Sequence, residues 1–144
     1  MKIKTWIRRY PLTAALSVLI WIACMIPVPE TPLSDVNMID KWTHLVMFGT
    51  LSAVVLAERI KNEKKKASNH GQEVASFSWL HALLCSFLFA WCTGGLIELA
   101  QAHLTCGIRS GEWLDFFADG IGALLGLPIG ILLAKCVARW KKAP

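Results

Sequence analysis

The stretch Leu96–Gly130, LIELAQAHLTCGIRSGEWLDFFADGIGALLGLPIG, decides the fold. It contains the end of one apolar run, a short polar connection and most of a second apolar run. Glu98 lies in the first run, and Asp115 and Asp119 open the second. Acidic side chains beside apolar segments long enough to cross a lipid bilayer are energetically costly, and they mark polar sites in membrane proteins. This stretch is therefore the main clue to both fold and function.

Similar apolar runs occur along the rest of the chain. Of its 144 residues, 55% are hydrophobic and 17% are charged, which is too apolar for a soluble domain of this size. Four segments approach the roughly 20 residues that a helix needs to cross a bilayer: residues 11–28, 41–59, 77–100 and 115–138, approximately. They lack the polar face of soluble helices. The sequence predicts an all-α fold, a single domain over residues 1–144 built as a four-transmembrane-helix bundle. The first segment also has features of a signal peptide, but its apolar run continues through Cys24, which favours an uncleaved span.

The basic residues are segregated by these spans. Four precede the first span, five lie between the second and third, and four close the fourth, which makes thirteen of the fifteen. By the positive-inside rule this side is cytoplasmic, so we expect both termini inside the cell. The basic patches are then signals of topology, and we expect no nucleic-acid partner.

Eight polar residues fall at the opposite, outer membrane boundary in this topology. They are Asp40, Lys41, His44, Glu98, Gln101, Arg109, Asp115 and Asp119. Helical positions three or four apart share a face, so the second, third and fourth spans should converge on one polar cluster with Arg109 folded over it. Gly122, Gly126 and Gly130 repeat every four residues, which predicts a small-residue face for close helix packing.

These residues resemble a known family. The pattern Asp40-Lys41-x-x-His44, Ile97-Glu98-x-x-Gln101, Arg109 and Asp115-x-x-x-Asp119-x-x-Gly122-x-x-x-Gly126 resembles the VanZ-like family of small bacterial membrane proteins. The resemblance covers residues 40–126, and asparagine is frequent in that family at the position of Asp119. It implies a multi-pass protein of the bacterial inner (cytoplasmic) membrane. It also implies an association with low-level resistance to the lipoglycopeptide teicoplanin, without an established reaction.

Three functional classes are compatible with the cluster. In the first, the protein binds membrane lipids, and Lys41, His44 and Arg109 hold an anionic lipid head group, a lipid-linked cell-wall intermediate or a lipoglycopeptide. In the second, a membrane enzyme uses His44 and the carboxylates as acid and base on a lipid-linked substrate. In the third, the charges only pair with one another and fix the helices. We favour the first.

No metal site or cofactor is assigned from the sequence, although a cation held by His44 and carboxylates is one form of the enzymatic alternative. The five cysteines include no CxxC pair, so zinc and redox sites of that type are disfavoured.

Overall fold

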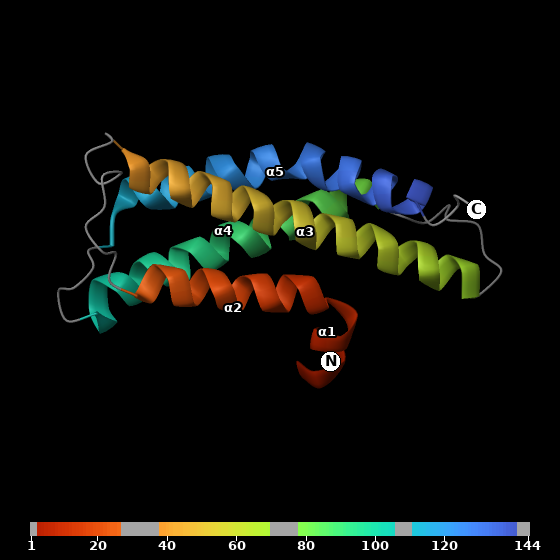
Figure 1. Cartoon of the computed structure of the whole chain (residues 1–144), viewed down its shortest axis with the longest axis horizontal. Helices are drawn as coiled ribbons and strands as arrows, with labels where there is room; N and C mark the ends of the chain where they lie inside the picture. The colour runs from red at the N-terminus through yellow and green to blue at the C-terminus, as the bar shows by residue number, and fades with distance from the viewer. Residues whose placement is uncertain (1–2, 27–37, 70–77, 106–110, 141–144) are drawn as a thin grey trace.

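Five α-helices account for most of residues 3–26, 38–69, 78–105 and 111–140, which the computed structural model describes (Figure 1). In chain order they are α1 (Ile3–Arg9), α2 (Pro11–Met25), α3 (Ile39–Asn69), α4 (Trp79–Leu104) and α5 (Trp113–Trp140). Helices α2 to α5 lie lengthwise beside one another, and α1 turns away from the bundle at the N-terminal end of α2. The predicted all-α fold is confirmed for these residues.

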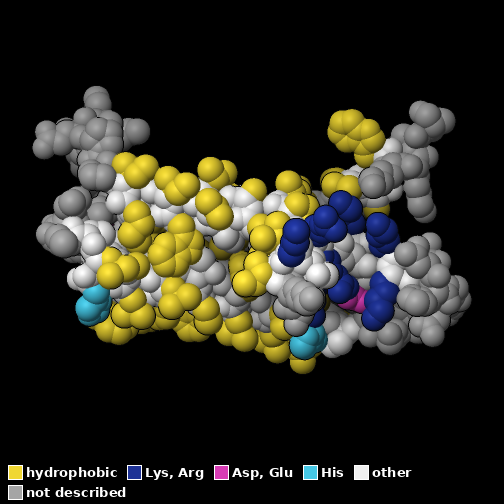
Figure 2. Space-filling view, turned by 90° about the horizontal axis from the view of Figure 1, so that it is seen from below, with side chains coloured by type: hydrophobic (Ala, Val, Ile, Leu, Met, Phe, Trp, Pro, Cys, Tyr) yellow, Lys and Arg dark blue, Asp and Glu magenta, His cyan; other side chains and the backbone are white. Residues whose placement is uncertain are grey.

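The surface of the bundle has the polarity of a membrane protein. Helices α3, α4 and α5 are each long and apolar enough to cross a membrane, and α1 with α2, bent by 103°, could form one more span. Large apolar side chains such as Leu125 and Leu132 are more than half exposed, whereas Asp119 is fully buried. Apolar side chains cover much of the length of the bundle, and lysine and arginine gather towards one end (Figure 2). These features indicate a multi-pass membrane protein.

Helices α3 and α5 are packed with their backbones almost in contact. A Cβ atom added at Gly122, Gly126 or Gly130 would overlap a backbone carbonyl oxygen of α3. The three oxygens belong to Leu45, Gly49 and Ala53, respectively. Small residues allow this approach, and close packing is a main source of helix association in lipid. The repeat of glycines therefore faces the bundle, as its spacing predicts.

Helix α3 is longer than the sequence analysis expects. The predicted second span ends near residue 59, and the polar, lysine-rich residues 61–76 after it predict a solvated loop. This prediction is wrong for residues 61–69, because α3 continues to Asn69. Lysine, glutamate and alanine in this segment favour helix, and the segment contains no glycine or proline. The extension also has partners: the Asn62 side chain donates a hydrogen bond to the Arg9 carbonyl oxygen, and Glu63 lies 3.5 Å from Arg9.

Helix α2 is held at both ends by side chains from other helices. Its N-cap residue provides no side-chain hydrogen bond. Instead Glu58 of α3, only 6% exposed, accepts hydrogen bonds from the backbone N–H groups of Leu12 and Thr13 at 3.1 and 3.0 Å. At the other end, the Gln101 side chain of α4 donates to the Cys24 carbonyl oxygen at 2.9 Å. Glu58 thus acts as a helix cap supplied across the bundle.

We expect Glu58→Ala to lower the free energy of unfolding by about 1–3 kcal/mol, because it leaves buried N–H groups of α2 without an acceptor. The measurement is thermal or denaturant unfolding of the purified protein in detergent. Glu63→Ala is the matched control on the same helix; its more exposed ion pair with Arg9 should contribute only about 0–1 kcal/mol. Equal stability losses in the two variants would argue against the cap.

Candidate functional site

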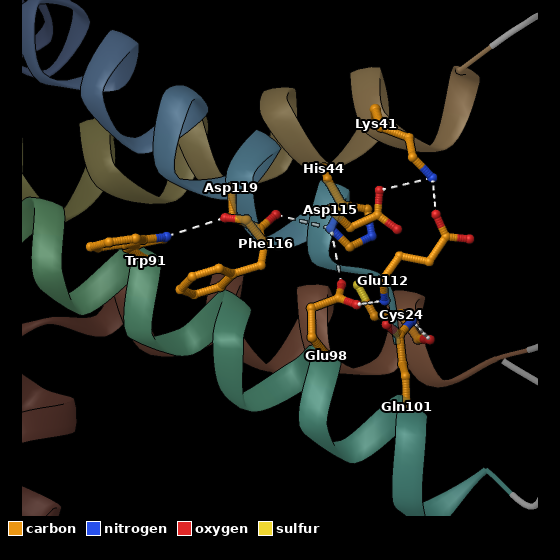
Figure 3. Close-up of polar contacts among 10 residues, drawn as sticks. All are labelled: Cys24, Lys41, His44, Trp91, Glu98, Gln101, Glu112, Asp115, Phe116 and Asp119. Carbon is orange, nitrogen blue, oxygen red and sulfur yellow. Dashed lines mark hydrogen bonds and ion pairs between the residues drawn. The ribbon is translucent and has the colours of Figure 1, made fainter. Parts of the chain in front are cut away.

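One end of the bundle, which we call the acidic end, is formed by the first turns of α3 and α5 and the last turns of α4 (Figures 1 and 3). Its polar residues are Asp40, Lys41, His44, Glu98, Gln101, Glu112, Asp115 and Asp119. The opposite part of the bundle, which we call the basic end, contains the last turns of α3 and α5 with Lys64, Lys65, Lys66, Lys135 and Arg139. Arg8 and Arg9, in the last turn of α1, belong to the same basic group, since Arg9 lies 3.5 Å from Glu63 of α3.

His44 is the centre of the acidic end. It lies on α3 one turn after Asp40, and its side chain is 1% exposed. Its Nδ1 atom lies 2.9 Å from Asp119 Oδ1 on α5 and 3.5 Å from Glu98 Oε1 on α4. One imidazole therefore joins three helices. The carboxylate of Asp119 also requires Gly94 opposite it, since a Cβ there would overlap the carboxylate.

Lys41 forms a second, more exposed group of contacts at the rim. Its Nζ atom lies 2.5 Å from Glu112 Oε2 and 3.3 Å from Asp115 Oδ1. The side chains of Lys41 and Glu112 are 19% and 44% exposed, whereas that of Asp115 is 3% exposed. Asp115 is therefore the buried partner of Lys41, and Glu112 is the partner that solvent or a ligand can reach.

The residues just before α5 fix the orientation of Glu98. The backbone N–H of Glu112 donates a hydrogen bond to Glu98 Oε2 at 2.7 Å. Gly111 passes so close to α4 that a Cβ there would overlap the carbonyl oxygen of Glu98. Because Oε2 is held in this way, Oε1 faces His44 (Figure 3).

Two buried carboxylate oxygens at the acidic end, Glu98 Oε1 and Asp119 Oδ2, make no hydrogen bond with the residues described. Buried carboxylates are costly unless charge or hydrogen bonds compensate them. The five described acids of this end also outnumber its described bases, Lys41, His44 and His103. The chemistry favoured here is the binding of a cation or the sharing of protons between His44 and its neighbours.

The structure brings together most of the residues predicted from the sequence. Asp40, His44 and Asp115 lie close to one another, as do His44, Glu98 and Asp119. Gln101 is buried nearby but turns to α2. Arg109 lies outside the described residues. Glu112 and Gly94 are not among the residues predicted from the sequence; the signal for Glu112 is its position next to the first turn of α5.

A groove of about 600 Å³ lies beside the acidic end, between α4 and the start of α5. Its walls are mostly apolar and include Leu96, Leu99 and Phe116. Two carboxylate residues, Glu98 and Glu112, also line it. Trp91 of α4 holds Phe116 of α5 in place. Its indole N–H donates a hydrogen bond to the Phe116 carbonyl oxygen at 3.2 Å, and the Trp91 and Phe116 rings stack. The mostly apolar groove is thus continuous with the polar cluster through Glu98 and Glu112.

No family model, curated protein or solved structure matches the chain.

Proposed function

We propose that the protein crosses the bacterial cytoplasmic membrane four times, with α1 and α2 as one bent span and both termini in the cytoplasm. The separation of the basic end from the acidic end supports this topology, since basic residues are retained on the cytoplasmic side. The acidic end then lies at the outer membrane boundary.

At that boundary the protein binds a lipid or a lipid-linked molecule, with an acyl chain in the groove and an anionic head group beside Lys41. Glu112 is the observation that carries this proposal. Its carboxylate lines the groove and also lies 2.5 Å from Lys41 Nζ. The Glu112 carboxylate marks a position where Lys41 holds an anion, and a phosphate or carboxylate of a ligand can displace this exposed side chain. Lys41 retains Asp115 as its buried partner.

The ligand class includes a membrane lipid, a lipid-linked cell-wall intermediate and a lipoglycopeptide of the teicoplanin type, because each combines a hydrocarbon chain with a polar group. Membership of the VanZ-like family and a contribution to glycopeptide resistance are parts of the same proposal. They rest on the motif residues between Asp40 and Gly126.

Opposite effects of two rim substitutions test the head-group contact. Lys41→Gln should weaken binding of phosphatidylglycerol and of a polyprenyl phosphate, while Glu112→Gln should strengthen it, because it removes the carboxylate that competes for Lys41. We expect changes of about tenfold, the equivalent of about 1.4 kcal/mol. Binding of uncharged diacylglycerol should not change. Native mass spectrometry of the detergent-solubilised protein measures all three ligands.

The groove itself has a matched pair of variants. Ala102→Phe fills the groove and should weaken binding of all three lipids, whereas Ala15→Phe, at an exposed position of α2, should not. If Glu112→Gln weakens binding and Lys41→Gln has no effect, the head group is not held as an anion. If Ala102→Phe binds lipid like the unmodified protein, the groove is not the site, and the ion pairs only fix the helices.

A further inference from the structure

We infer that His44, Glu98 and Asp119 form a binding site for one divalent transition-metal ion. Each residue comes from a different helix, α3, α4 and α5. One ligand atom from each lies within 4.8 Å of the other two, and all three residues are buried. An imidazole nitrogen with two carboxylate oxygens is a donor set that suits Zn²⁺ or Mn²⁺. This inference does not rest on the lipid proposal.

The spacing of the donor atoms fits a metal ion. In a tetrahedral zinc site with bonds of about 2.0–2.2 Å, neighbouring donor atoms lie roughly 3.3–3.6 Å apart. His44 Nδ1 lies 2.9 Å from Asp119 Oδ1 and 3.5 Å from Glu98 Oε1, close to this separation. Small outward shifts of the Asp119 carboxylate would complete the geometry.

An unpartnered atom points to a ligand independently of the acidic cluster. Glu98 Oε1, which faces His44 Nδ1 at 3.5 Å, makes no hydrogen bond to the described residues, and the Glu98 side chain is only 9% exposed. Glu98 is also held in place by the backbone N–H of Glu112, which binds its other oxygen. Metal-binding carboxylates are commonly oriented by such a hydrogen bond from outside the coordination sphere.

The negative charges of Glu98 and Asp119 are compensated better by a divalent ion than by the neighbouring basic side chains. Lys41 is shared by Glu112 and Asp115, so its charge is already compensated. A protonated His44 would neutralise only one of the two carboxylates that face it. A divalent ion neutralises both while a neutral imidazole serves as its nitrogen ligand. A second set, Asp40, His44 and Asp115, is the rival site, but Asp40 is only half-buried and Asp115 is bound to Lys41.

Metal loading of the full-length, tag-free protein in detergent tests the inference. The protein is stripped with a chelator, equilibrated with Zn²⁺ or Mn²⁺ and desalted, after which bound metal and melting temperature are measured. We expect about one ion per chain and a higher melting temperature. Glu98→Gln and Asp119→Asn should each lower the affinity at least about 10–100-fold. Asp115→Asn should keep one ion per chain, as should Glu63→Gln near the basic end.

Three results would overturn the inference. The first is unmodified protein that binds no ion after stripping and reloading, a result that does not depend on how the variants fold. The second is a full complement of metal in both Glu98→Gln and Asp119→Asn, which would place the ion on other residues. The third is loss of metal in Asp115→Asn alone, which would assign it to the rival site. If the substituted proteins do not fold, X-ray absorption of the loaded, unmodified protein must show one imidazole among oxygen ligands.

Discussion

Replacing Gly126 by leucine is expected to separate α3 from α5 and to destabilise the bundle. Its Cβ would overlap the carbonyl oxygen of Gly49. A backbone oxygen cannot swing aside as the end of a flexible side chain can, so the two helices must move apart. Forced insertion into a packed interior costs about 1–3 kcal/mol, and we expect this site at or above the upper limit. Thermal unfolding in detergent measures the loss.

The control is Leu124→Phe, which adds volume at a position of α5 that is 53% exposed. Leucine is a better helix former than glycine, so any loss in Gly126→Leu must come from packing between helices. Gly122→Leu should reproduce the effect, because a Cβ there would overlap the carbonyl oxygen of Leu45. A Gly126→Leu protein that melts with the unmodified one would contradict the close packing of α3 and α5.

His44→Leu is expected to lower the free energy of unfolding by about 3–5 kcal/mol in protein stripped of metal. The substitution leaves Asp119 and Glu98 buried without the imidazole that lies between them. Breaking one partner of a buried charge pair has effects of this size, because the remaining charge stays desolvated. Denaturant unfolding in detergent is the measurement.

The double variant His44→Leu/Asp119→Leu separates this explanation from simple loss of packing. Removing both partners also removes the uncompensated charge of Asp119, so the double variant should be more stable than the sum of the single losses predicts. The carboxylate of Asp119 lies against Gly94, which leaves little room for a larger residue, so Asp119→Ala serves as the second choice. Strict additivity of the two changes would show that His44 and Asp119 do not interact.

Local spacing made much of the architecture predictable. Asp115 and Asp119 share a helical face with Gly122 and Gly126, so their common orientation follows from the helix alone. The convergence of His44 with Glu98 is also predictable, because polar side chains within membrane-spanning helices face the bundle interior and pair with one another. The glycine repeat of α5 predicts which face of that helix packs closely against a neighbour. It does not predict which residues of α3 lie opposite.

Other contacts leave no mark on the local sequence. Glu58 caps a helix that begins more than 40 residues earlier, and no rule of spacing connects them. The contact between Glu112 and Glu98 uses a backbone N–H, which every residue except proline carries. The end of α3 differs from the prediction because a highly charged segment can be a solvated helix as well as a loop, and lysine and glutamate are good helix formers.

The order of the helices along the chain has a consequence for the order of events during membrane insertion. Helix α2 is translated before α3, α4 and α5, and its own sequence, PLTAALSVLIWIACM, contains no charged side chain, so it can reside in lipid before those partners exist. Helix α3 is less stable alone in lipid, because its polar residue His44 is translated 75 residues before its partner Asp119. The buried contact of His44 with Asp119 can therefore form only after α5 has been translated, so α5 completes the polar cluster that α3 and α4 begin.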